Sequence, residues 1–134
     1  FSTVVAQVVI ISMPKGGEMK VERVVTAVDC GTVINPDQVR AQVEGAVGFG
    51  LGAILQEELT LTKGQVDQGN YDTYTPLRIN QMPKVEVHWI ASDAPPTGIG
   101  EPGVPPVGPA LANAVYQATK KRLRVLPMSK GLSA

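Results

Sequence analysis

The sequence predicts an α+β domain with its elements in the order β-β-α-β-β-β-α. Three observations predict this class: a β-branched run at the amino end, a helix-start signal at Asn35, and an amphipathic helical pattern near the carboxyl end. The 134 residues, 43% of them hydrophobic, suffice for about one domain with its own core. We therefore expect a single domain over residues 1–134.

The first two elements are expected to be strands. Residues Thr3 to Met13 are mostly β-branched and favour a strand that is buried on both faces. The P-K-G-G stretch from Pro14 to Gly17 is typical of a turn, and Val21 to Val28 is again mainly apolar. The pair therefore predicts an antiparallel hairpin that could be central in a sheet.

A helix is expected to begin at Asn35, because Asn is a good N-cap, Pro36 suits the first helical position and Asp37 complements the helix dipole. Apolar residues then recur at three- and four-residue steps, which predicts one buried stripe made of Val39, Val43, Ala46, Val47, Leu51, Ile54 and Leu55.

Glycines are frequent in the same helical segment, at Gly45, Gly48, Gly50 and Gly52. Together they would cost about 4 kcal/mol relative to alanine in a helix interior. Either the helix is broken or another group approaches its backbone closely. The stretch lacks the preceding strand and the Lys-Ser/Thr pair of a phosphate-binding P-loop, so close packing is the preferred explanation.

Three further strands are expected after this helix. The segments Glu58 to Thr62 and Gln65 to Asp67 flank a Lys63-Gly64 turn and predict a second hairpin, and a polar loop follows from Gln68 to Thr75. The stretch from Lys84 to Ile90 alternates as a half-exposed strand does, with one apolar face made of Val85, Val87 and Trp89, and Glu86 and His88 on the other.

The last predicted element is an amphipathic helix entered through Pro105, Pro106 and Pro109. Its apolar positions recur at helical spacing, at Val107, Leu111, Ala114, Val115 and Ala118. It is expected to end in three basic residues that suit the negative end of the dipole, Lys120, Lys121 and Arg122.

Charge and cysteine content exclude several classes of function. Twelve basic residues balance twelve acidic ones, so no overall field attracts the chain to nucleic acid or to an anionic membrane. Cys30 is the one cysteine, which excludes a disulfide framework and any iron–sulfur cluster held by this chain alone. The apolar run from Val4 to Ile11 is interrupted by Gln7 and is far shorter than the roughly 20 residues of a membrane span.

Glu101 is the strongest catalytic candidate. It lies in T-G-I-G-E-P-G-V-P-P, from Thr97 to Pro106, where glycine and proline predict a loop of defined and partly rigid shape. Such a loop can direct a carboxylate into a pocket as a general base. From composition alone, a solvent-exposed turn glutamate explains the same residues.

Other polar residues have plain structural interpretations. His88 has no histidine, aspartate or cysteine at metal-ligand spacing, and nothing near Cys30 in sequence would activate a thiolate, so the chain itself predicts no metal ligands. Gln42 reads as an ordinary polar helix residue. The loop with Tyr71 and Tyr74 reads as a surface loop, with a place along a substrate channel as the alternative.

Three motifs together resemble a known family. They are A-V-D-C-G-T-V-I-N-P-D from Ala27, Q-V-E-G-A-V-G-F-G-L-G from Gln42, and G-E-P-G-V-P-P-V-G-P-A-L-A-N-A from Gly100. In this order they resemble the C-terminal end of the molybdenum-binding subunit of the xanthine dehydrogenase/aldehyde oxidoreductase family. The G-E-P-G-x-P-P form is most similar to the isoquinoline 1-oxidoreductase large subunit and related bacterial aldehyde dehydrogenases.

The resemblance implies roles for three residues. Glu101 would be the catalytic base beside the molybdenum, Gln42 would hydrogen-bond the pterin of the molybdopterin cofactor, and Gly100 would also contact the cofactor. The cofactor would be the cytosine dinucleotide form. The reaction implied is oxidation of an aldehyde or an N-heterocycle with water as the oxygen source.

The resemblance also implies partners, because family members have a much longer molybdenum subunit and a separate iron–sulfur subunit or domain that removes the electrons. This chain would be the C-terminal cofactor-binding module, inactive alone. The alternative is a non-catalytic structural or partner-binding domain that keeps the fold and packs on other chains through an apolar face.

Overall fold

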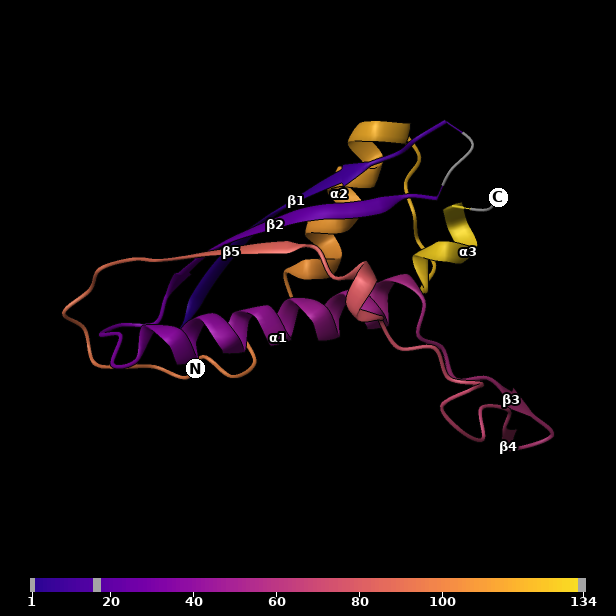
Figure 1. Ribbon diagram of the computed structural model, residues 1–134, viewed down its shortest axis with the longest axis horizontal. Helices are drawn as coiled ribbons and strands as arrows, with labels where there is room; N and C mark the ends of the chain where they lie inside the picture. The colour runs from indigo at the N-terminus through magenta and orange to yellow at the C-terminus, as the bar shows by residue number, and fades with distance from the viewer. Residues whose placement is uncertain (1, 16–17, 133–134) are drawn as a thin grey trace.

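The computed structural model describes residues 2–15 and 18–132. Part of the predicted Pro14–Gly17 turn lies outside these residues. Figure 1 shows a body made of a sheet and helices, from which a small two-stranded arm projects. The elements, in chain order, are β1 (Val4–Ser12), β2 (Lys20–Asp29), α1 (Pro36–Leu55), β3 (Leu61–Thr62), β4 (Gln65–Val66), η1 (Ile79–Gln81), β5 (Lys84–Trp89), α2 (Val107–Thr119) and α3 (Met128–Leu132).

The main sheet has three strands in the order β1-β2-β5. β1 and β2 pair antiparallel, as predicted, with Val9 opposite Val24 and Gln7 opposite Thr26. β5 joins the other edge of β2 in parallel, with Val87 opposite Thr26. The helices α1 and α2 lie against this sheet and bury a core formed mainly by Val24, Val28, Val43, Val47, Leu51, Val107, Leu111 and Val115.

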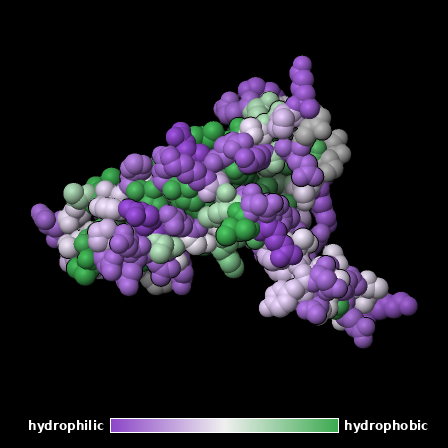
Figure 2. All heavy atoms as spheres, viewed as in Figure 1, coloured by the Kyte–Doolittle hydropathy of each residue, from purple (hydrophilic) through white to green (hydrophobic). Residues whose placement is uncertain are grey.

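The prediction that β1 is buried on both faces is wrong. Its side chains alternate, so that Val9 is buried while Val4 and Val8 are 67% and 61% exposed. The strand forms an edge of the sheet, and within the described residues the helices cover only the face that carries Val9. The opposite face presents an apolar row on β1 and, on the far side of β2, the charged residues Lys84 and Glu86 of β5. Figure 2 shows apolar and polar atoms mixed over the surface of the molecule.

α1 is unbroken over its 20 residues, although it carries the four glycines. Asn35 caps it as predicted, accepting hydrogen bonds through its side-chain oxygen from the backbone N–H groups of Asp37 and Gln38. The glycines permit close packing at three sites. A Cβ on Gly50 would lie 3.2 Å from the Val107 side chain, and one on Gly48 would lie 3.2 Å from the sulfur of Met82.

The third close approach is at Gly52, where an added Cβ would meet the carboxylate of Glu57. Gly45 differs, because an added Cβ there would meet nothing within 4 Å. Close contacts with other side chains of the chain therefore account for Gly48, Gly50 and Gly52, but no such contact accounts for Gly45.

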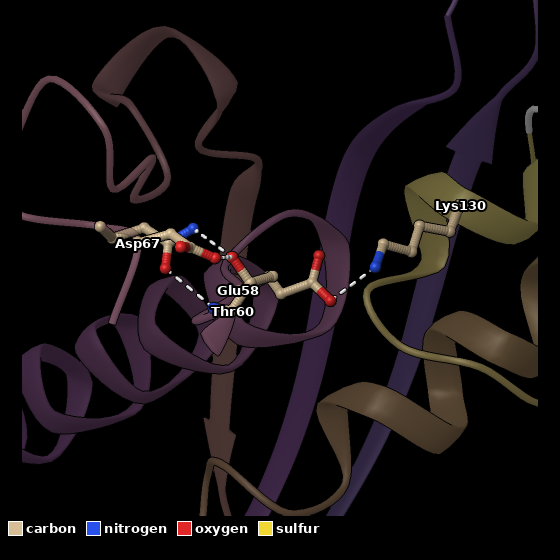
Figure 3. A network of polar contacts seen from close by, with 5 residues as sticks. Glu58, Thr60, Asp67 and Lys130 are labelled. Atoms are coloured by element: carbon tan, nitrogen blue, oxygen red, sulfur yellow. Dashed lines mark hydrogen bonds and ion pairs between the residues drawn. The ribbon is translucent and has the colours of Figure 1, made fainter. Parts of the chain in front are cut away.

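β3 and β4 form the predicted second hairpin, although shorter than expected. Lys63 and Gly64 both have positive φ, as the two central residues of a type I′ turn require. Figure 3 shows how polar contacts hold the arm: the Thr60 hydroxyl donates to Asp67, and Lys130 of α3 pairs with Glu58. The hydrogen bond from Thr60 is the main cause that holds the pKa of Asp67 below its usual value.

α2 ends earlier than predicted. Its last residue is Thr119, and Lys120 adopts the left-handed conformation with φ of 60° that commonly terminates a helix. The basic residues therefore follow the helix instead of filling its last turn. Arg122 instead lies over the ring of Tyr116, with 4.4 Å from its guanidinium carbon to the ring centroid. The short α3 and the 3₁₀ turn η1 add to the predicted order.

Candidate functional site

The loop that carries Glu101 is fixed first at the end of β2. After β5 the chain passes the carboxyl end of β2 and returns along the amino-terminal half of α1, as Figure 1 shows in orange. The Thr32 N–H donates to Ala94 O at 2.9 Å, and the Thr97 N–H donates to Cys30 O at 2.9 Å. Gly31, with φ of +71°, is needed here because a Cβ would lie 2.2 Å from the Pro95 carbonyl oxygen.

Two polar side chains, Thr3 immediately before β1 and Gln7 within it, hold the same loop further along. The Thr3 hydroxyl shares a hydrogen bond of 2.6 Å with the Thr97 hydroxyl and lies 2.6 Å from Gly98 O. The Gln7 amide donates to Gly103 O at 3.0 Å. Thr3 and Gln7 are an even number of positions apart, so they lie on one face of the strand. The segment from Thr97 to Gly103 is thus fastened near both of its ends.

A cavity of about 550 Å³ lies between this loop and the beginning of α1. Gln42 contributes to its wall, as do Gln38 and Asn35 from the helix side. Pro96, Thr97 and Ile99 line the opposite side, and Cys30 lies at the strand end. Gln42 is exposed, and its side chain makes no hydrogen bond within the described part of the chain. Its amide is therefore available to a bound molecule.

Glu101 does not line this cavity but lies in the turn that follows Ile99. Its backbone oxygen accepts the Val104 N–H at 3.0 Å, and its side chain is exposed. Ile99, two residues before it, lines the cavity, while Gly103, two residues after it, lies against α1 at Ala46. The fold therefore brings the Glu101 turn and Gln42 to the same edge of α1, although no hydrogen bond joins the two side chains among the described residues.

Gly100, the remaining predicted site residue, is exposed, and an added Cβ would meet nothing within 4 Å. Its backbone therefore has open space around it. Packing within the chain does not require glycine at this position.

The residues of the cavity fit a polar organic cofactor better than a metal ion held by the protein. The described residues contain no group of three or more His, Cys, Asp or Glu side chains that could bind a metal. The wall instead offers amide and hydroxyl groups, including the unpaired Gln42 amide, next to apolar Val33 and Ile34. Amide donors and acceptors of this kind suit the ring nitrogens and oxygens of a pterin.

The other candidate residues from the sequence, His88, Tyr71 and Tyr74, do not line the cavity beside α1. His88 is exposed on the uncovered face of the sheet. The Tyr74 hydroxyl donates to Glu57 at 2.6 Å, and Tyr71 is 81% exposed on the arm. Both tyrosines line a separate hollow of about 420 Å³ on the arm.

Sequence reasoning missed the anchors Thr3 and Gln7. A signal for one of them existed, because Gln7 is the polar interruption of the apolar run in β1.

No helix within residues 2–15 and 18–132 is long and apolar enough to cross a membrane.

Comparison with known proteins relates this architecture to cofactor-binding domains. Residues 1–83 match the family model described as molybdopterin cofactor-binding domain. The chain is 40% identical over 112 residues to the membrane-bound aldehyde dehydrogenase (pyrroloquinoline-quinone) of Gluconacetobacter polyoxogenes, covering 84% of this chain and 14% of that protein. It is 38% identical over 115 residues to isoquinoline 1-oxidoreductase subunit beta of Brevundimonas diminuta, covering 86% and 15% respectively.

Solved structures share the fold. Quinoline 2-oxidoreductase from Pseudomonas putida 86 superposes with a TM-score of 0.75 at 22% identity, covering 83% of this chain and 15% of that one. The aldehyde oxidoreductase from Desulfovibrio desulfuricans superposes with a TM-score of 0.68 at 25% identity, covering 83% and 13%. The chain thus spans a small part of the length of its relatives. It belongs to the molybdopterin cofactor-binding domains of the xanthine dehydrogenase/aldehyde oxidoreductase large subunits.

Proposed function

We propose that this chain is the C-terminal part of the molybdenum-binding subunit of a molybdenum hydroxylase and that it supplies the general base. The observation that carries the proposal is the placement of the Glu101 turn, which is fixed between β1 and α1 beside the cavity that Gln42 lines. The complete enzyme would oxidise an aldehyde or an N-heterocycle. Residues 1–134 would act in it as a single domain.

Three residues would serve the cofactor and the reaction. The Gln42 amide would hydrogen-bond the pterin, and the open backbone at Gly100 would let the cofactor approach the loop. When bound, molybdopterin would supply the metal centre at which the substrate is oxidised, with water as the source of oxygen. Glu101 would accept the proton of that water-derived nucleophile on a carboxylate oxygen, a role that typically contributes about 10²- to 10⁴-fold to a rate.

The rigid loop matters to this role because a general base acts only within hydrogen-bond reach of the proton it removes. The hydrogen bonds from Thr3 and Gln7 hold the loop on the strand side, while Gly103 packs on the helix side. The carboxylate itself is exposed in this chain, so the rest of the subunit would have to close the site around it.

The rest of the subunit is also the occupant we propose for the uncovered sheet face. The relatives above are about seven times as long as the matched region, and β1 presents exposed Val4, Val8 and Ile10 on that face. We further propose the cytosine dinucleotide form of the cofactor and a partner subunit whose iron–sulfur clusters remove the electrons, in line with the family resemblance.

The test of the base is Glu101→Gln in the full-length subunit with its partners. Turnover should fall by at least 10²-fold while molybdenum and pterin per protein stay at the wild-type level, because only the proton acceptor is removed. Glu18→Gln, at an exposed position outside the loop, is the matched control. Retention of wild-type turnover by the Glu101 variant would exclude it as the base.

A second candidate function is a non-catalytic module that binds a partner through the uncovered face. The exposed apolar row on β1 favours it, since such surfaces mark interaction sites. Metal analysis of the complex purified with its partners separates the two. Folded complex without molybdenum supports the module, and stoichiometric molybdenum supports the hydroxylase.

A further inference from the structure

Gln7 is the polar residue within the apolar run of β1 from Val4 to Ile11, and the proposed reaction assigns it no role. Its side chain extends from the helix-covered face of β1 and donates from the amide nitrogen to Gly103 O at 3.0 Å. Gly103 closes the turn whose first residue is Glu101, because the Val104 N–H donates to Glu101 O. The Gln7 amide therefore holds the carbonyl next to the hydrogen bond that defines the turn.

The other end of the same amide faces a second buried polar group. Gln7 Oε1 and Thr26 Oγ1 are both buried, and neither makes a hydrogen bond within the described residues, either to the other or to a third group. Gln7 and Thr26 are directly opposite in the antiparallel register, where Cβ atoms are typically about 4.5–5.5 Å apart. On its other side Thr26 faces Val87, which has no polar side-chain atom.

The Gly103 carbonyl defines the orientation of the amide, because a carbonyl oxygen only accepts hydrogen bonds and therefore requires the NH₂ group. Gln7 Oε1 is then the free end of the amide, and the hydroxyl of Thr26, directly opposite on β2, is a group that can donate to it. Burying both oxygens unpaired is costly, and a hydrogen bond from the Thr26 hydroxyl to Gln7 Oε1, formed after a small shift or through one water, would remove that cost.

We propose that Gln7, supported by the hydroxyl of Thr26, is the positioning residue for the Glu101 turn. The consequence for the reaction rests on the proposed function of Glu101. The structural role of Gln7, which joins β1 to the turn through its hydrogen bond to Gly103, does not depend on that function. Gly103 lies between Gln7 and α1, since its Cβ position is 2.8 Å from the Cβ of Ala46. The turn is thus held from the strand side by a hydrogen bond and supported from the helix side by packing.

The experiment uses Gln7→Met in the full-length subunit, which keeps the length of the side chain and removes the donor. Hydrogen exchange of the Val104 amide reports the turn directly, because this amide donates to Glu101 O. We expect its exchange to accelerate about fivefold, the effect of losing one hydrogen bond. In the loaded enzyme kcat should fall while KM and molybdenum content stay unchanged.

Val9→Ala is the matched control, because Val9 lies on the same face of β1 and its apolar side chain cannot hydrogen-bond to the turn. It should destabilise the sheet without selective acceleration at Val104. Equal acceleration in Gln7→Met and Val9→Ala would overturn the proposal by showing a general loss of stability. Unchanged exchange in Gln7→Met would overturn it as well.

Thr26→Val and Thr26→Ser test whether the Thr26 hydroxyl supports the Gln7 amide. Valine keeps the shape and loses the donor, whereas serine keeps the donor and loses a methyl group. Selective acceleration at Val104 should therefore appear with valine and be absent with serine. The reverse order, or equal effects, would refute the role of Thr26. If the exchange results hold but kcat is unchanged in both Gln7→Met and Glu101→Gln, the fault lies with the proposed base and not with the positioning contact.

Discussion

Gly103 lies against Ala46 so closely that a Cβ on Gly103 would be 2.8 Å from the Cβ of Ala46. The backbone of α1 is also near, with Val43 Cα at 3.7 Å from the same Cβ position. The turn that carries Glu101 is therefore seated directly on the helix that carries Gln42. A side chain at Gly103 would lift the turn from the helix.

Gly103→Ala should therefore destabilise the chain by about 1–3 kcal/mol, the usual range for overpacking. Urea unfolding measures this change. Gly100→Ala is the control, since a Cβ there meets nothing within 4 Å, and it should stay within about 0.5 kcal/mol of wild type. Equal effects of the two alanines would show that Gly103 is not a contact point.

Adding Ala46→Gly to Gly103→Ala tests the contact itself. The second substitution restores the space but costs about 1 kcal/mol as a glycine in a helix. The double variant should therefore be more stable than the sum of the two single changes predicts. Strict additivity would contradict the contact.

Alanine substitution at two glycines of α1 should change the free energy of unfolding in different directions. Gly45→Ala should raise the free energy of unfolding by about 0.5–1 kcal/mol, because the position is exposed and the Cβ meets no neighbour. Gly50→Ala gains the same helix propensity but places a Cβ 3.2 Å from Val107, so it should be neutral or destabilising. Urea unfolding midpoints, compared between variants with equal m-values, measure both changes in stability. A stabilising Gly50→Ala would show that Val107 can move aside at little cost.

The order of the elements was predictable from local signals. The Asn35 cap and the apolar stripe of α1 depend only on neighbouring residues, and so does the Lys63-Gly64 turn. The burial of β1 was not predictable, because it depends on which layers cover the sheet. A run of β-branched residues is typical of a strand that is buried on both faces, whether or not this chain supplies a layer over the second face.

The candidate site was predictable in its parts but not in its assembly. Glycine and proline mark the loop of Glu101, yet only the fold places that loop beside Gln42. The role of Gln7 depends on a hydrogen bond across 96 positions of sequence, which no local pattern contains. The parallel pairing of β5 with β2 was also not predicted, since it depends on the crossover that includes α1 and the arm.

The uncovered sheet face should tolerate charge in this chain but not in the complete subunit. Val8→Lys replaces a side chain that is 61% exposed, so urea unfolding of the 134-residue chain should change by no more than about 0.5 kcal/mol. If the rest of the subunit covers this face, the same substitution buries a charge there and should lower the stability of the full-length subunit by several kcal/mol.

His88→Lys is the control for that comparison, because His88 lies on the polar side of the same face. It should have a smaller effect than Val8→Lys in the full-length subunit. Val8→Lys with an equally small effect in both proteins would show that the apolar row stays exposed to solvent.

The Tyr74 hydroxyl donates to Glu57 Oε2 at 2.6 Å, and this hydrogen bond is the main cause that raises the pKa of Tyr74 above its ordinary value of 10.0. Because the folded-state pKa is raised, the stabilising contribution is fully present below pH 10.0 and is lost as the pH rises through the folded-state pKa. An ultraviolet titration of tyrosinate should therefore reveal one tyrosine that ionises late. Glu57→Gln should return its pKa toward the ordinary value.

Tyr74→Phe identifies the signal, because it should remove the late ionisation that Tyr71→Phe leaves in place. The same variants test how the arm is attached to the body. Glu57 follows the end of α1, and Tyr74 lies in the segment that leads from the arm back to the body, so their hydrogen bond ties the two ends of the arm together. Loss of the bond should loosen the loop between Gln68 and Thr75 without changing the core, because the pair lies outside the cluster of buried side chains. A late-ionising tyrosine that survives Glu57→Gln would mean that burial, and not the Glu57 carboxylate, holds the proton on the phenol.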